Sequence, residues 1–282
     1  MLVAACSSTG GPATTASATA VPATTAPTPA PTPSAPRSTT TVRVYFYLGG
    51  EPGSAGLVPV PREVADEDPI EAALNALLAG PTTDEAGLRT ITSAIPVGSR
   101  LLGLTVADGI ATADLSIEFE SGGGSASMFI RLGQVVFTLT QFPSVQSVVF
   151  KIEGRPVTVF SAEGIVLDGP QGRADSEDVL PAIFVDLPTY GGALGNPGRI
   201  SGTADVFEAA FRVAIMDEAG NTIADVPAMA TCGTGCRGTF DLAVPYSVDR
   251  AQPGILKVWD PSAKDGSPEN VREYPVALTP AD

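Results

Sequence analysis

The chain has 282 residues, which is enough for about two domains of roughly 100–150 residues each. It contains no histidine, which excludes Ser-His-Asp and Cys-His catalytic sites and all imidazole metal ligands. The net charge of −15, offset by only three lysines, argues against nucleic acid as a partner. The 30 glycines, 26 prolines and 6% aromatic residues indicate β-rich domains together with a non-globular part.

Residues 1–6 have the character of the end of a secretory signal. Val3-Ala4-Ala5-Cys6 resembles the bacterial lipobox, and this resemblance implies that Cys6 is a lipid attachment site. The alternative is an incidental cysteine in an alanine-rich start. Because the chain has no run of 18 apolar residues, we expect the membrane attachment to be a lipidated Cys6 rather than a transmembrane helix.

Residues 7–41 form a stalk of low sequence complexity. Apart from Val21 and Arg37, every residue is Ala, Gly, Ser, Thr or Pro. Such a segment buries too little apolar surface to offset the entropy lost on ordering. We therefore expect a disordered spacer, extended over its proline-rich half.

Residues 42–160 predict a small α/β domain. Val42–Leu48 has the alternating, β-branched pattern of a strand. Asp68 and Pro69 predict the start of a helix that Gly80-Pro81 ends. Asp108-Gly109 predicts a type I′ turn. Further along the chain we expect a hairpin of Leu101–Ala107 with Ile110–Leu115, a helix over Ser125–Phe142 with a strand as the alternative, and strands at Val145–Ile152 and Pro156–Phe160.

Four motifs in this region, found in family order, make it similar to the GerMN domain of bacterial spore germination and sporulation proteins. They are Ile70–Pro81, Ile95–Leu101, Asp108–Ser116 and Gln134–Val145. The resemblance covers nearly all of the segment. It implies a small α/β domain akin to ring-building motifs, a non-enzymatic role and the capacity for self-association, and it brings no catalytic residues.

Residues 161–179 are acidic and glycine-containing, and we expect them to be an interdomain linker. Residues 180–282 then show no capped helix, only short β-type segments divided by turn signals, which predicts an immunoglobulin-like sandwich. The expected strands are Ile183–Leu187, Arg199–Ala204, Phe207–Met216, Thr222–Met229, Gly238–Tyr246, Ile255–Trp259 and Val271–Leu278.

This second domain resembles the immunoglobulin-like domain that commonly follows GerMN domains. The resemblance rests on Pro188, Ile200–Ala204, Val206–Phe211, Gly238–Phe240 and Ser262–Gly266. It implies a recognition module. The expected fold class is therefore α+β, with an α/β domain followed by an all-β sandwich.

Cys232 and Cys236 are separated by Gly-Thr-Gly. We expect them to form a disulfide, stabilising the fold by roughly 2 kcal/mol, because a lipobox implies an outward-facing compartment. Half of a metal site is the alternative, but the sequence offers no histidine and its one other cysteine is Cys6 in the signal-like segment.

A few side chains have two interpretations. Glu118 and Glu120 are interpreted as solvated charges two apart on a strand, with a glycosidase carboxylate pair as the alternative. Trp259 is interpreted as a core residue, with a partner anchor as the alternative. Phe207 and Phe211 are expected to pack on one face of a strand.

The sequence as a whole predicts an extracytoplasmic lipoprotein of the cell envelope that binds an envelope protein or wall polymer. We expect no catalytic residue, no cofactor and no bound metal. The alternative is a cell-wall glycan hydrolase with paired carboxylates, for which two acidic side chains would have to meet in a deep cavity.

Overall fold

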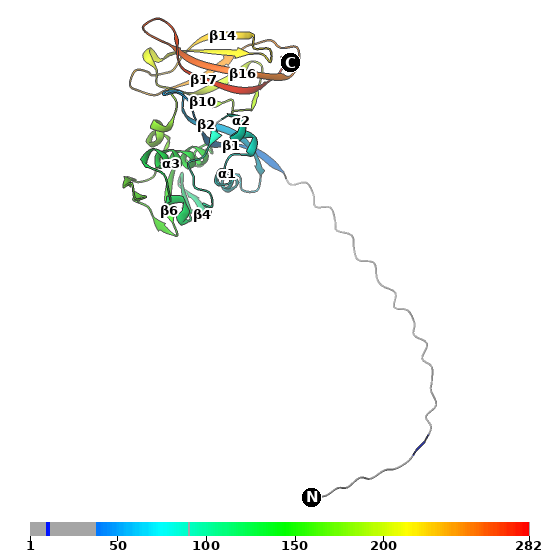
Figure 1. Cartoon of the computed structure of the whole chain (residues 1–282), viewed down its shortest axis with the longest axis vertical. Helices are drawn as coiled ribbons and strands as arrows, with labels where there is room; N and C mark the ends of the chain where they lie inside the picture. The colour runs from blue at the N-terminus through cyan, green and yellow to red at the C-terminus, as the bar shows by residue number, and fades with distance from the viewer. Residues whose placement is uncertain (1–9, 12–37, 90, 282) are drawn as a thin grey trace. The chain divides into compact units, whose positions relative to one another are not determined.

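The computed structural model describes residues 10–11, 38–89 and 91–281. Cys6 and all of the predicted stalk before Ser38, other than Gly10 and Gly11, lie outside the described residues. From Ser38 onward the chain belongs to one compact unit that contains both predicted domains (Figure 1). The predicted α+β class is confirmed, since helices and sheets come first and a β-sandwich follows.

The first domain is built on two small sheets and two main helices. Its elements are β1 (Thr39–Leu48), β2 (Gly56–Ala65), α1 (Pro69–Leu78), α2 (Thr83–Arg89), β3 (Ile91–Thr92), β4 (Leu101–Ala107), β5 (Ile110–Leu115), the 3₁₀ helix η1 (Ile117–Glu120), α3 (Ser125–Leu139), β6 (Ser147–Ile152), β7 (Arg155–Pro156) and β8 (Val159–Phe160). The strands pair in the orders β2-β1-β3 and β4-β5-β6-β7. Since β1 begins at Thr39, the last three residues of the predicted stalk belong to a strand.

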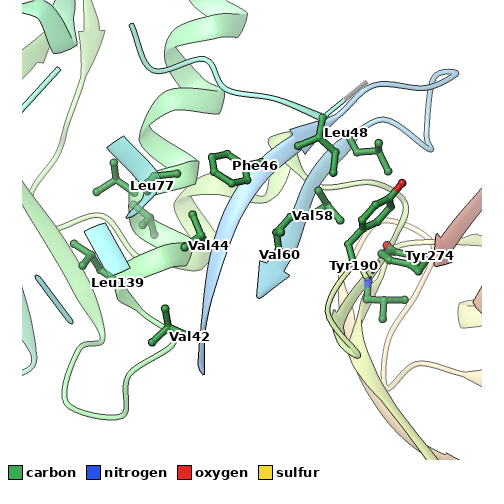
Figure 2. Close-up of a cluster of buried hydrophobic side chains, with 14 of the residues drawn as sticks. Val42, Val44, Phe46, Leu48, Val58, Val60, Leu77, Leu139, Tyr190 and Tyr274 are labelled. Atoms are coloured by element: carbon green, nitrogen blue, oxygen red, sulfur yellow. Dashed lines mark hydrogen bonds between the residues drawn. The ribbon is translucent and has the colours of Figure 1, made fainter. Parts of the chain in front are cut away.

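The β1–β2 ribbon lies at the centre of the unit. Val44 and Phe46 on β1 are fully buried, and Figure 2 shows Leu77 and Leu139 of the two helices on one side of the ribbon and Tyr190 and Tyr274 of the second domain on the other. Alternation along β1 therefore supplies apolar contacts to the helices. The ribbon belongs to the first domain and is also the surface on which the second domain packs.

Helix α1 forms where the sequence predicts it. The Asp68 carboxylate accepts a hydrogen bond from the Glu71 backbone N–H at 3.2 Å, Pro69 takes the first helical position, and Gly80 has a positive φ of 83° just beyond the end. The apolar positions Ala73, Leu74 and Leu77 are fully buried. Local signals alone are sufficient to define this helix.

The β4–β5 hairpin also follows the prediction. Asp108 and Gly109 have φ values of 51° and 81°, as a type I′ turn requires. Strand β5 then pairs in parallel with β6, and α3 is the crossover between them. The predicted helix is thus confirmed for residues 125–139 and the strand alternative is wrong, and the segment beyond Leu139 is not helical. The predicted strand 156–160 is two short strands in different sheets.

Polar side chains of α3 and of the turn after it bind the backbone of β1. Gln134 and Thr138 are buried one turn apart on α3, and Gln141 follows just beyond the end of the helix. Gln134 Nε2 donates to the Tyr45 carbonyl at 3.0 Å, and Thr138 Oγ1 accepts from the Tyr45 N–H at 3.1 Å. Gln141 accepts from the Arg43 N–H at 2.7 Å and donates to its carbonyl at 2.5 Å. These side chains supply the partners that a neighbouring strand would otherwise provide.

Residues 161–179, expected to be an open linker, are folded against the first domain. They contain β9 (Ile165–Val166), which pairs with β8, and the 3₁₀ helix η2 (Arg173–Val179). A bridge joins Gln171 to Val148. A Cβ on Gly133 of α3 would come within 2.7 Å of Val179, so η2 approaches α3 closely. The acidic composition reflects an exposed outer side, while Ser176 and Val179 are buried.

The second domain is the predicted sandwich. Its strands are β10 (Ile183–Leu187), β11 (Ala193–Leu194), β12 (Gly198–Ala204), β13 (Ala210–Met216), β14 (Thr222–Met229), β15 (Gly238–Val244), β16 (Gln252–Pro261) and β17 (Pro268–Leu278), with the short 3₁₀ helix η3 (Phe207–Ala209) before β13. One sheet has the order β10-β12-β15 and the other β11-β17-β16-β13-β14. Side chains such as Val213, Ile215, Leu256 and Val258 fill the space between the sheets.

Candidate functional site

The structure does not unite Glu118 and Glu120 as a catalytic pair. Both lie in η1 rather than on a strand, and with three residues per turn in a 3₁₀ helix, residues two apart point in different directions. Glu118 faces Arg100 at 3.6 Å, whereas Glu120 lines a surface cavity with Ile117 and Val159. The Ser116 side chain, the local backbone and Arg100 hold the pKa of Glu118 below its usual value, the opposite of what a glycosidase acid needs.

Cys232 and Cys236 are bonded in the structure, with their Cα atoms 5.8 Å apart. The loop is tightly held. A Cβ on Gly238 would lie 2.2 Å from the Cys232 nitrogen, and one on Gly233 would lie 2.3 Å from the Ala209 nitrogen. The disulfide loop therefore fixes the backbone on either side of Arg237. Among the described residues, no group of three or more Cys, Asp or Glu side chains is placed to hold a metal.

The core interpretation of Trp259 is wrong. This side chain is only half-buried, on the outer face of the larger sheet, where Arg212 and Lys257 lie 5.8 and 5.7 Å from its ring. Asp225 pairs with Arg212 at 2.7 Å. The indole thus lies between two cations at the surface, in cation–π contact with both.

Phe207 and Phe211 do not share a face. Phe207 is 55% exposed and Phe211 only 2%. Glu208 and Ala209 between them have φ values of 53° and 59°, which interrupts the strand that both were expected to occupy. Phe211 packs on Phe240 in the sandwich, with ring centroids 4.8 Å apart, while Phe207 lies outside it.

A cluster around Asp186 joins the two domains. The Asp186 carboxylate on β10 accepts a hydrogen bond from the Tyr45 hydroxyl of β1 at 2.5 Å and pairs with Arg173 of η2 at 3.3 Å and Arg43 at 3.7 Å. Burial, followed by the charge of Asp186, raises the pKa of Tyr45. Burial opposes the charge of Arg173, but Tyr45 and Asp186 outweigh it and raise the pKa of Arg173. The partly buried Asp186 carboxylate is thus held by hydrogen bonds from Tyr45 and Arg173 and by the charge of Arg43.

An aromatic cluster continues the same contact. The ring of Phe184 on β10 lies 5.6 Å from Phe137 of α3 and 6.4 Å from Tyr45, and all three rings are buried. The Arg173 guanidinium lies 4.6 Å from the Phe137 ring. Together with Leu57 and Val179 these residues make a small core of their own. The domains are thus joined by apolar burial in addition to charge pairs.

Arg272 of β17 extends into the β1–β2 turn region. It is 3% exposed, and its guanidinium donates to the carbonyls of Ser54, Gly56 and Leu57 at 2.9, 3.3 and 2.8 Å. A backbone hydrogen bond adds to this contact, since the Ala182 N–H donates to the Gly53 carbonyl at 2.7 Å. The second domain is therefore attached to the β1–β2 turn and to the start of β2.

A cavity of about 320 Å³ opens beside this junction. Phe137 and Arg173 line it from the first domain and η2, and Phe184, Gly202 and Arg237 line it from the sheet β10-β12-β15. Charged groups and aromatic rings meet here without filling the space. The lining is therefore more polar than that of most small-molecule sites, which are predominantly apolar.

Comparison with protein families accounts for both parts of the unit. Residues 43–158 match the Germane family, described as "Sporulation and spore germination", and residues 182–267 match Gmad2, described as an immunoglobulin-like domain of bacterial spore germination. The chain carries a GerMN domain followed by a Gmad2 domain. The resemblance drawn from the sequence is thereby confirmed for both domains. Neither description includes a catalytic activity.

Solved structures with similarity to the chain include two of the sporulation protein GerM from Bacillus subtilis. Its tandem GerMN domains match with 27% identity and a TM-score of 0.40, over 48% of this chain and 46% of that one. Its first GerMN domain matches with 21% identity and a TM-score of 0.38, over 48% of this chain and 99% of that one. This chain therefore spans under half of the tandem-domain structure. Among curated proteins no match is found.

The residues between the two family matches belong to the junction. Residues 159–181 fall outside both, yet they supply Arg173 to the Asp186 cluster and Leu180 to the cavity. Sequence reasoning missed Arg173, Asp186 and Arg237. One signal was available for the first of them, because Arg173 is the single basic residue in the acidic segment 161–179.

Proposed function

We propose that this protein is a non-catalytic binding or scaffold module of the bacterial cell envelope, held at the outer side of the membrane by a lipid on Cys6 and related to sporulation or germination. The observation that carries the proposal is the GerMN–Gmad2 pair joined through a buried contact around Asp186. A rigid pair of recognition domains presents surfaces in a fixed geometry, as a scaffold requires.

Support for a binding role comes also from the positions of Glu118, which pairs with Arg100, and of Glu120, which lines a surface cavity whose lining does not include Glu118. No helix in the described part of the chain is long and apolar enough to cross a membrane. Cys6 lies outside that part, so lipidation is proposed from the lipobox resemblance alone.

The GerMN domain offers a surface for a second copy of the chain. Strand β4 is at the end of the sheet order β4-β5-β6-β7, and its Leu102 and Val106 are 48% and 38% exposed. An unpaired strand edge with apolar side chains is a template for strand pairing, and two identical edges can pair about a twofold axis. We propose an envelope protein or wall polymer as the partner of the remaining surface.

Anchoring and self-association have separate tests. If the precursor is expressed with its signal, the wild type should sediment with membranes and Cys6→Ser should appear in the soluble fraction. Equal retention of both would contradict the lipid anchor.

For self-association, Val106→Lys in the full chain should shift sedimentation toward monomer, because a lysine opposes pairing of the strand edge. Val97→Lys is the matched control, since Val97 is fully exposed outside β4. Monomeric wild type at all concentrations, or equal effects of both variants, would contradict pairing through β4.

A further inference from the structure

The cavity beside the domain junction is walled by elements from both domains. The outer face of the sheet β10-β12-β15 forms one wall, with Ser201, Thr203 and Asp241 among its residues, and η2 with the end of α3 forms the other. Its volume of about 320 Å³ is at the lower end of the range for ligand sites, roughly 300–1,000 Å³. The space suits a small organic molecule or the end of a short chain.

Arg237 is the one arginine of this cavity without an acidic partner. Among the described residues, no carboxylate lies within 4.0 Å of its guanidinium, which donates a hydrogen bond to the Thr203 hydroxyl at 3.4 Å. The side chain is half-buried. Burial lowers the pKa of Arg237, and the charges of Glu177 and Asp205 offset this only in part. A desolvated guanidinium with free N–H groups favours an added anion.

Most of the other charges around the cavity are in ion pairs. Arg173 is paired with Asp186, which also pairs with Arg43, and Asp241 is paired with Arg199 at 2.7 Å. Glu177 is exposed to solvent and acts on Arg237 only at longer range. Although the whole chain carries a net charge of −15, Arg237 presents to this cavity a cation that forms no direct ion pair with a described residue.

The remaining lining combines the polar Ser201 and Thr203 with apolar side chains. Of the apolar ones, Leu180 is partly buried, while Phe137 and Phe184 lie behind it with only 1% of their surface exposed. Gly202 contributes open backbone, and a Cβ there would lie 1.9 Å from the Phe184 carbonyl oxygen. Any side chain at position 202 would therefore disturb this wall.

We propose that this cavity binds a small carboxylate with an apolar body, the carboxylate on Arg237 and the body against the apolar part of the wall at Leu180. The planar guanidinium fork matches a carboxylate in a bidentate manner, and the partly buried Leu180 side chain favours an aliphatic or aromatic group. The C-terminal end of a short apolar peptide has this chemistry. Inorganic phosphate fits less well, because a dianion would face Asp186, Asp241 and Glu177 and would leave the apolar wall uncovered.

Two matched probes test the proposal on the full chain. Titration of 3-phenylpropionate, followed by amide chemical shifts in NMR, should give saturable shifts at Gly202, Thr203 and Arg237. The uncharged analogue 3-phenylpropanamide should bind at least tenfold more weakly, since a charge-assisted hydrogen bond is lost. Equal binding of the two probes, no saturable binding of the carboxylate, or its full displacement by an equal concentration of inorganic phosphate would overturn the proposal.

Matched variants locate the site. Arg237→Gln keeps a hydrogen-bonding side chain without the charge and should weaken the binding of 3-phenylpropionate at least tenfold. Its thermal unfolding midpoint shows whether the variant is folded. Arg250→Gln removes an exposed arginine paired with Glu218 and should bind as the wild type does. If Arg237→Gln does not fold, Ser201→Trp places a bulky ring at the cavity wall and should abolish binding. Wild-type affinity in the folded cavity variant would contradict the site.

Discussion

Arg272 is a charged side chain with only 3% of its surface exposed, and its partners are backbone carbonyls of the other domain. Burial lowers the pKa of Arg272 because it removes water from the charged guanidinium. Hydrogen bonds to three carbonyls and the contact with the Tyr274 ring offset this loss of hydration. The two terminal nitrogens of Arg272 bind these carbonyls, whereas its Nε is buried without a hydrogen-bond partner. Removal of the side chain takes three hydrogen bonds away from the contact between the domains.

Replacing Arg272 by alanine should therefore lower the free energy of unfolding by about 3 kcal/mol or more. Arg250→Ala is the control, because that arginine is exposed and its pair with Glu218 lies at the surface, where the change should stay within about 0.5 kcal/mol. Urea denaturation of the full chain measures both. Similar losses in the two variants would show that the carbonyl contacts of Arg272 contribute little.

Tyr45 and Tyr274 make the free energy of unfolding depend on pH in the alkaline range. Burial raises the pKa of both, and Asp186 adds to the effect at Tyr45. The unfolded chain releases these protons near the ordinary tyrosine value of 10.0, whereas the folded protein holds them to higher pH. Their contribution is thus complete below pH 10 and is lost as the pH rises above it.

We expect the free energy of unfolding to fall above pH 10 by up to about 1.4 kcal/mol per pH unit for each of the two tyrosines. Tyr274→Phe should remove one of these two contributions to the dependence of the unfolding free energy on pH, and the double variant Tyr45→Phe, Tyr274→Phe should remove both. This holds however much stability each variant loses at neutral pH. Urea denaturation across this pH range measures the slope. A double variant as steep as the wild type would contradict the assignment.

At the scale of elements, the sequence predicted the helices and turns whose ends are determined by neighbouring residues. Helix α1 has its cap at Asp68 and its stop at Gly80, and the β4–β5 turn has Asp108-Gly109. Strand β2 was missed because Pro59 and Pro61 argue against a strand, yet β2 lies at the end of the order β2-β1-β3, where proline is tolerated. Edge position is a property of the fold and cannot be read from the segment itself.

Other elements depend on contacts far apart in sequence. Gln134, Thr138 and Gln141 look like ordinary polar helix residues until β1 supplies the backbone groups that they bind. Arg173 and the segment 161–179 look like a solvated linker until α3 and Asp186 are beside them. The Cys232–Cys236 pairing could be predicted because its spacing is local. The cavity around Arg237 combines residues of α3, η2, β10, β12 and β15 and had no sequence signal.

Two glycines of one hairpin should respond oppositely to alanine. Gly109 in the turn has a φ of 81°, and a Cβ there would lie 3.3 Å from the Gln146 side chain, whereas Gly103 on β4 has ordinary backbone and open space around it. Gly109→Ala should cost about 1–2 kcal/mol, while Gly103→Ala should be neutral or stabilising by up to about 1 kcal/mol. Thermal unfolding of the full chain compares them. Equal effects would contradict the turn geometry.

At the scale of the whole molecule, the junction determines whether the two domains unfold separately or together. Interfaces between domains of one chain are often polar and mobile. Here the interface contains the buried rings of Tyr45, Phe137 and Phe184, the three-way contact at Asp186 and the carbonyl contacts of Arg272. Neither domain can separate without exposing apolar surface and unpairing buried charge.

The sequence provides one probe for each domain. Its single tryptophan, Trp259, lies in the Gmad2 domain, and the described α-helices α1, α2 and α3 all lie in the GerMN domain. Tryptophan fluorescence therefore reports on the second domain, and helical circular dichroism reports mainly on the first. Coincidence of two such probes is the standard sign of a single cooperative transition.

In the wild type we expect both probes to give the same midpoint in urea. Phe184→Ala removes a ring that faces the GerMN domain. It should separate the two midpoints, because each domain is then stabilised less by its contact with the other. Phe207→Ala is the control: the side chain is a phenylalanine of the same domain, but it is 55% exposed and lies outside the junction, so its midpoints should remain together. Separate midpoints already in the wild type would mean that the buried junction does not couple the domains, and coincident midpoints in Phe184→Ala would mean that the coupling does not depend on the aromatic cluster.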